Sequence, residues 1–155
     1  MLRYHGRLHE ALELDSNSPT AHVWLGLSYV ARLTWEPAIA ALQKAVELSG
    51  RTPVAVACLG EAYAAAGFAD EARNVLRELT GKVHVTVYFV SRIHAALGES
   101  NEAIDWLEIA YKQHGEWMVL LKVDPRFDSL RHDSRFQDLM RRMNFPELAA
   151  NRTEA

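Results

Sequence analysis

The chain has 155 residues, of which 49% are hydrophobic and 24% charged, values typical of a folded globular protein and too apolar for a disordered one. Seventeen Lys and Arg residues against twenty Asp and Glu give a net charge of −3 with His neutral, which argues against a nucleic-acid partner. The single cysteine excludes an internal disulfide and any multi-cysteine metal centre.

Membrane and export signals are missing from the sequence. No run of about 18 apolar residues occurs, so we expect no membrane insertion. The opening stretch MLRYHGRLHEALEL has scattered charges and no continuous apolar segment, unlike a secretory signal peptide. These patterns predict a cytoplasmic protein.

An internal repeat is the strongest pattern in the sequence. A shift of 34 residues aligns two copies, and a further shift of 31 aligns a third. The pairs matched by the first shift are Pro19 and Pro53, Leu25 and Leu59, Gly26 and Gly60, Tyr29 and Tyr63, Ala38 and Ala72, and Leu42 and Leu76. The pairs matched by the second are Gly60 and Ser91, Gly67 and Gly98, Ala72 and Ala103, and Leu76 and Leu107.

Each copy is predicted to form two helices. Residues 1–18 are expected to hold the second helix of a partial copy, and residues 19–52, 53–82 and 83–115 to hold three complete copies. In the first of these, PTAHVWLGLSYVARL and EPAIAALQKAVEL both have apolar residues at helical spacing. The second copy is expected to break at Gly67, because glycine suits a left-handed helix end. Small residues such as Gly26 and Ala38 recur where two helices must approach closely.

One segment favours a different local structure. Residues 83–90, VHVTVYFV, are rich in β-branched and aromatic residues and by propensity alone resemble a strand. The repeat places them in the first helix of the third copy, and packing commonly overrides a propensity of a few tenths of a kcal/mol per residue. We therefore predict a helix there.

The repeat pattern ends near Gly115. Residues 116–148 are expected to cap the stack, with a short helix over residues 117–122, a turn at Asp124-Pro125, and a last helix from Asp133 or Ser134 to a point before Pro146. The apolar residues expected to cover the open end are Phe127, Leu130, Phe136, Leu139, Met140 and Met143. Residues 149–155 are expected to be a flexible tail.

The repeat resembles the tetratricopeptide repeat (TPR) family, whose unit carries Leu-Gly, Tyr, Gly, Ala, an aromatic residue or Leu, and Ala at fixed spacing. The matching residues of the second copy are Leu59, Gly60, Tyr63, Gly67, Ala72 and Leu76. The first copy has Leu33 in place of the usual glycine, and the third has His94 in place of the tyrosine. The resemblance implies an all-α, right-handed α-solenoid of antiparallel helix pairs, here one domain over residues 1–148.

The resemblance also implies a concave groove lined by the first helix of each pair. The groove positions are Val23, Trp24, Leu27 and Val30 in the first copy, Ala57, Cys58, Glu61 and Ala64 in the second, and Tyr88, Phe89, Arg92 and Ala95 in the third. Most are apolar, so the expected ligand is a peptide or helix of a protein partner. Glu61 and Arg92 either bind charges on that ligand or pair with each other.

Two alternative functions stay open. The C-terminal motif Asp-Pro-Arg-Phe-Asp…Arg-Phe-Gln-Asp-Leu resembles the end of repeat modules in bacterial signalling proteins that carry kinase, cyclase or winged-helix domains. This chain would then be a regulatory segment of a larger protein, whose upstream part could fill the groove. A third hypothesis is a self-associating scaffold, with a contact face formed by Leu2, Tyr4, Leu8, Ala11 and Leu12.

Catalytic chemistry has little support in the sequence. His5 and His9 are one ligand short of a metal site, and Asp124, Asp128 and Asp133 lack the spacing of a calcium loop. Cys58 lies in an apolar helix, where a thiol is usually inert. Ser91 and His94 lie three residues apart, with no third group to orient them. We expect no enzymatic activity, no cofactor and no metal.

Overall fold

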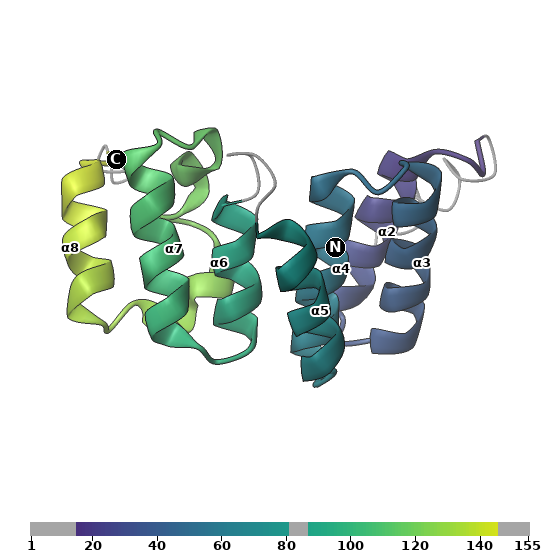
Figure 1. The fold of residues 1–155 in the computed structure, drawn as a ribbon, viewed down its shortest axis with the longest axis horizontal. Helices are drawn as coiled ribbons and strands as arrows, with labels where there is room; N and C mark the ends of the chain where they lie inside the picture. The colour runs from purple at the N-terminus through teal and green to yellow at the C-terminus, as the bar shows by residue number, and fades with distance from the viewer. Residues whose placement is uncertain (1–14, 81–86, 146–155) are drawn as a thin grey trace, which may run out of the picture.

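The computed structural model describes residues 15–80 and 87–145, and over these residues every regular element is a helix (Figure 1). The elements in chain order are α2 (Pro19–Val30), α3 (Trp35–Leu48), α4 (Pro53–Ala65), α5 (Ala69–Leu79), α6 (Val87–Ala96), α7 (Ser100–Lys112), the 3-10 helices η2 (Glu116–Leu120) and η3 (Pro125–Leu130), and α8 (Ser134–Met143). The all-helical prediction is confirmed for the described part of the chain.

The helices pack first with their neighbours in sequence. α2 packs on α3, α4 on α5, and α6 on α7, while α3 with α4 and α4 with α6 join one pair to the next. Figure 1 shows the pairs side by side along the long axis of the molecule, from α2 and α3 at one end to α8 at the other. The core is correspondingly divided. One apolar cluster is centred on residues of α3 to α6, and a second joins α6 and α7 to the C-terminal segment.

Small residues allow the paired helices to approach. Ala38, Ala72 and Ala103, which occupy the same repeat position, are each 0% exposed. A Cβ atom on Gly26 would lie 2.5 Å from Cγ of Leu42, and one on Gly60 would lie 2.5 Å from Cγ1 of Val75. Larger side chains at these positions would force the helices apart, which is the physical reason for the repeated small residues.

The turn within each helix pair uses a left-handed residue at the same repeat position. Gly67 has a φ of 87° and Gly98 a φ of 77°, as expected of glycine after a helix C-terminus. The corresponding residue of the first pair is Leu33, with a φ of 57°. Its Cβ atom makes that conformation costly, so the first turn carries strain that the other two avoid.

The region that favoured a strand is helical where it is described. α6 begins at Val87, so Val87–Val90 lie in a helix; residues 83–86 are outside the described part of the chain. Val87, Tyr88, Phe89 and Val90 are all buried, and burial against α4 and α7 outweighs their weak preference for strands.

The C-terminal segment differs from the prediction in its first half. The helix predicted over residues 117–122 is the 3-10 helix η2, and a second 3-10 helix, η3, begins at Pro125 with Asp124 as its N-cap. The last helix is confirmed: Asp133 caps α8 by accepting hydrogen bonds from the backbone N–H of Arg135 and Phe136. Phe127, Leu130, Phe136 and Leu139 are buried in the second apolar cluster.

Several predictions concern residues that the structure does not describe. The proposed self-association face of Leu2, Tyr4, Leu8, Ala11 and Leu12 lies there, as do most of the partial copy over residues 1–18 and the tail over 149–155. Among residues 15–80 and 87–145, no helix has both the length and the apolar character needed to cross a bilayer.

Candidate functional site

The predicted groove positions on α2, α4 and α6, which we call the inner face, divide into a covered part and an uncovered part. On α4 and α6 they are almost all buried. The buried residues are Ala57, Cys58, Glu61, Ala64, Tyr88, Phe89 and Arg92, and Ala95 is partly exposed. The chain therefore covers this part of its own inner face.

The covering layer is the C-terminal segment from Glu116 to Leu130. The ring of Trp117 packs edge to face on Phe89, with 5.2 Å between ring centroids. The ring of Phe127 packs in the same way on Tyr88, with 5.7 Å between centroids. The Tyr88 hydroxyl donates a hydrogen bond of 2.9 Å to Oδ2 of Asp124. Aromatic contacts and a buried hydrogen bond thus fix the segment to α6.

A buried ionic cluster joins the segment to both α4 and α6. Glu61 on α4 accepts hydrogen bonds from the guanidinium groups of Arg92 on α6 and Arg126 on η3. Arg126 also donates from Nη1 to Oδ1 of Asp124 at 3.0 Å. We call Glu61, Arg92, Asp124, Arg126 and Tyr88 the buried ionic cluster. It contains two guanidinium groups and two carboxylates, so its charges are balanced.

The pKa values in this cluster follow from burial and pairing. Burial by itself would raise the pKa of Asp124, but the Arg126 guanidinium and the hydrogen bonds from Arg126 and Tyr88 hold that pKa below its usual value. Burial would lower the pKa of Arg126, and the charges of Glu61 and Asp124 raise it instead. Burial and the adjacent Asp124 both raise the pKa of Tyr88. Asp124 and Arg126 therefore stay ionised around neutral pH, with the Tyr88 phenol neutral.

This arrangement stabilises structure better than it supports chemistry. Burial, as the largest cause, raises the pKa of the Cys58 thiol to about 11, so the thiolate that a nucleophile needs is scarce at neutral pH. The carboxylates of Glu61 and Asp124 are occupied by arginine. In the described part of the chain, no three His, Cys, Asp or Glu side chains are grouped closely enough to hold a metal ion.

The prediction of a groove open along three copies therefore needs correction at α4 and α6. The alternative that Glu61 and Arg92 pair with each other is the one the structure contains. Arg126 and Asp124, which complete the cluster, were not predicted to lie there. A signal was available: Glu61 is the only charged residue of α4, and a lone carboxylate on an apolar helix needs a partner when it is buried.

Within the described residues, the inner face of α2 is less covered than that of α4 and α6. Val23, Leu27 and Val30 are partly buried against the first apolar cluster, and Trp24 is 58% exposed. Trp24 stands beside a depression of about 450 Å³ between α2 and α4. Its lining consists of the apolar residues Pro19, Val23, Trp24, Val54 and Ala55 and the polar residues Thr20, Ser49 and Thr52.

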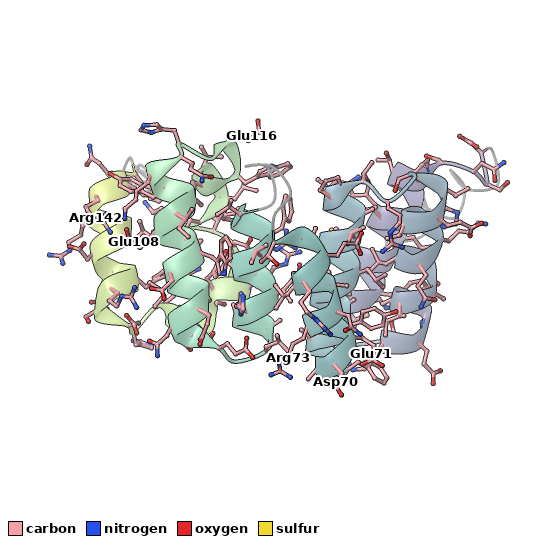
Figure 2. The ribbon with its side chains drawn as sticks, in the orientation of Figure 1. Asp70, Glu71, Arg73, Glu108, Glu116 and Arg142 are labelled. Carbon is pink, nitrogen blue, oxygen red and sulfur yellow. The ribbon has the colours of Figure 1, made fainter. Side chains whose placement is uncertain are left out.

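The basic residues near the C-terminus are paired with carboxylates. Figure 2 shows Arg142 of α8 and Glu108 of α7 pointing toward one another, and the two form an ion pair. Arg135 pairs with Asp105 on α7, and Arg131 with Asp128. These pairs lie mostly in solvent, where screening leaves an ion pair little net effect on stability.

A second polar group lies away from the inner face, between α5, α6 and α7. His94 Nδ1 lies 2.7 Å from Oε2 of Glu99, and Arg73 donates to Oε1 of Glu99 at 2.8 Å. Burial opposes the ionisation of Glu99, but the hydrogen bonds from His94 and Arg73 outweigh it and lower the pKa of Glu99. The sequence predicted that His94 replaces the repeat's tyrosine, but it did not predict the contact between His94 and Glu99.

Comparison with known proteins adds no constraint on the site. No protein-family model matches the chain, and no curated protein matches it.

Proposed function

We propose that the chain is a TPR-like α-solenoid that acts as a non-catalytic protein-interaction module. Three observations support the solenoid. The helices pack in successive pairs, the alanines at one repeat position are completely buried, and the turn within each pair has a positive φ at the same position. A stack of such pairs buries its core between neighbours and leaves extended surfaces for partners.

The observation that supports binding best is the exposure of Trp24 beside the apolar depression on α2. A tryptophan offers a large apolar surface with little conformational entropy to lose, and it is the residue type most enriched among dominant contacts in protein interfaces. Its neighbours Val23, Leu27 and Val30 extend the apolar surface along the same helix. We therefore propose that a partner contacts the inner face at α2.

The chemistry of α2 limits what this partner can be. The helix sequence PTAHVWLGLSYV contains no Asp, Glu, Lys or Arg. A charged group of the partner would lose its water on this surface without gaining an opposite charge. The best match is an amphipathic helix or an extended segment whose apolar side chains pack around Trp24.

A binding comparison between two exposed apolar residues tests the proposal. Trp24→Ser should lower the affinity of the chain for its protein partner by about 30-fold. This is the effect of losing a dominant interface contact of roughly 2 kcal/mol. The matched control is Val123→Ser, because Val123 is also exposed but lies on the C-terminal segment.

Both variants should keep the helical circular dichroism of the parent chain, since neither side chain belongs to the buried core. If Trp24→Ser retained every partner at the parent affinity, α2 would not be the binding surface. Substitution of Tyr88 would not test binding, because Tyr88 is buried under the C-terminal segment.

A further inference from the structure

The charge pattern of α2 suits a contact with a second copy of the same helix. α2 lies at one end of the described helices (Figure 1), and its inner face is the surface proposed above to bind a partner. In a contact about a twofold axis, a side chain near the axis meets the same side chain of the other copy, so a charged residue there faces its own charge. The helix from Pro19 to Val30 has no Asp, Glu, Lys or Arg, which removes this repulsion along its whole length.

The most exposed apolar side chain of α2 lies at the centre of the helix. Trp24 is preceded by the residues from Pro19 and followed by those up to Val30, so it stands close to the midpoint of the 12-residue helix. Its side chain is 58% exposed. If two copies of α2 pack about a twofold axis at this position, the two Trp24 side chains meet and each removes apolar surface of the other from water.

The shape of the inner face of α2 is complementary to itself when the two helices are antiparallel. The depression beside Trp24 lies at the N-terminal half of α2, where Thr20 and Val23 line it. Leu27 lies in the C-terminal half of the helix. Antiparallel packing about Trp24 places the C-terminal half of each helix over the N-terminal half of the other. Leu27 of each copy then lies over the depression of the other copy.

The charged residues that flank α2 favour the same orientation. Asp15 lies nine residues before Trp24, Arg32 lies eight residues after it, and both are exposed. Antiparallel packing about Trp24 therefore brings Asp15 of each copy toward Arg32 of the other, whereas parallel packing brings like charges together. Exposed ion pairs contribute little to stability, but opposite charges at the rim of a contact set its orientation.

We propose that the partner of the inner face of α2 is a second copy of this chain, with the two α2 helices antiparallel about a twofold axis at Trp24. This inference rests on the function proposed above and names the partner of that surface. α2 itself supplies the helix with exposed apolar side chains that the surface requires. The contact is limited to one helix face and the adjoining depression of each copy, which is small for a permanent dimer, so association is reversible and depends on concentration.

Sedimentation velocity of the full chain at several concentrations tests the proposal. With a dissociation constant of about 20 µM, the order expected of a small apolar interface, the chain should be mostly monomeric at about 1 µM and mostly dimeric at about 300 µM. Trp24→Ser should weaken dimerisation by about 100-fold, because the side chain is lost from both copies at once. Val123→Ser is the matched control and should dimerise like the parent.

Each result separates this inference from the function on which it rests. A parent chain that is monomeric at about 300 µM would overturn the second copy as the partner. Binding of a different protein that Trp24→Ser abolishes would, in that case, still support the function proposed for α2. Dimerisation of Trp24→Ser with the parent's affinity would place the self-contact elsewhere and overturn the inference.

Charge reversal tests the antiparallel orientation. Asp15→Lys and Arg32→Glu should each weaken dimerisation by about ten-fold, because each creates two pairs of like charges across the axis. The double variant exchanges the two signs and should dimerise within about three-fold of the parent. Glu102→Lys reverses an exposed charge on α7 and should have no effect. Circular dichroism checks that every variant keeps its helical content. Single variants that dimerise like the parent, or a double variant no tighter than the singles, would overturn the antiparallel contact.

Discussion

The inner face of α2 and the inner face of α4 and α6 occupy the same repeat positions, yet over the described residues the first is only partly buried and the second is almost completely buried. The position held by Leu27 in α2 is held by Glu61 in α4 and by Arg92 in α6. The two charged residues pair with each other and with Arg126, and the C-terminal segment lies over them. Leu27 has no charged group and cannot form an ion pair of this kind. The residue type at one repeat position therefore decides the outcome: a charged residue there binds the C-terminal segment, and an apolar residue leaves a surface for another molecule.

The largest expected effect is the loss of stability when the carboxylate of Glu61 is removed from the buried ionic cluster. Glu61→Ala leaves the buried guanidinium group of Arg92 and the partly buried one of Arg126 without their shared carboxylate, so it should reduce the free energy of unfolding by about 3–5 kcal/mol. Urea denaturation followed by circular dichroism measures the change. The matched control is Glu78→Ala, because Glu78 pairs with the exposed Arg51 and should contribute no more than about 1 kcal/mol. Similar losses in both variants would contradict a special role for the buried ionic cluster.

A smaller expected effect is that the stability contributed by Asp124 depends on pH. The folded-state pKa of Asp124 lies below its ordinary value of about 4, so its stabilising contribution is present above about pH 4 and disappears as the pH falls through the folded-state pKa. Asp124→Asn should therefore cost about 2 kcal/mol at pH 7. Unfolding measurements should show the difference between the variant and the parent shrinking as the pH falls below about 4. A difference that stays constant across this range would mean that the Asp124 charge does not stabilise the segment.

The smallest expected effect concerns Leu33, in the turn between α2 and α3. Leu33→Gly should stabilise the protein by about 0.5–1 kcal/mol, because glycine adopts the positive φ of this turn without a Cβ clash. Leu33 is 70% exposed, so little burial is lost with its side chain. Leu33→Ala is the control: it removes the same exposed surface but keeps the Cβ atom, and thermal unfolding should show no comparable gain. A fall in stability for Leu33→Gly would contradict the strain at this turn.

The sequence by itself determined the features that depend on neighbouring residues. Helix ends were predictable because Asp133 and the glycines at 67 and 98 satisfy or permit local backbone geometry at the end of a helix. Close helix packing was predictable because a small residue such as Gly60 recurs at one position of a repeated unit. The pairing of Glu61 with Arg92 was predictable as one of two alternatives, since the repeat places them in adjacent copies.

Only the tertiary structure decided what lies on the inner face. Arg126 reaches Glu61 across 65 residues of sequence, and no periodic or local signal relates the two positions. The segment from Glu116 to Leu130 folds back because a buried carboxylate requires a partner and the rings of Tyr88 and Phe89 require cover. Those requirements are set by groups that meet only in the folded chain. Local signals could therefore specify the helices and their pairing, but the boundary between the covered and uncovered parts of the inner face depended on contacts across the whole molecule.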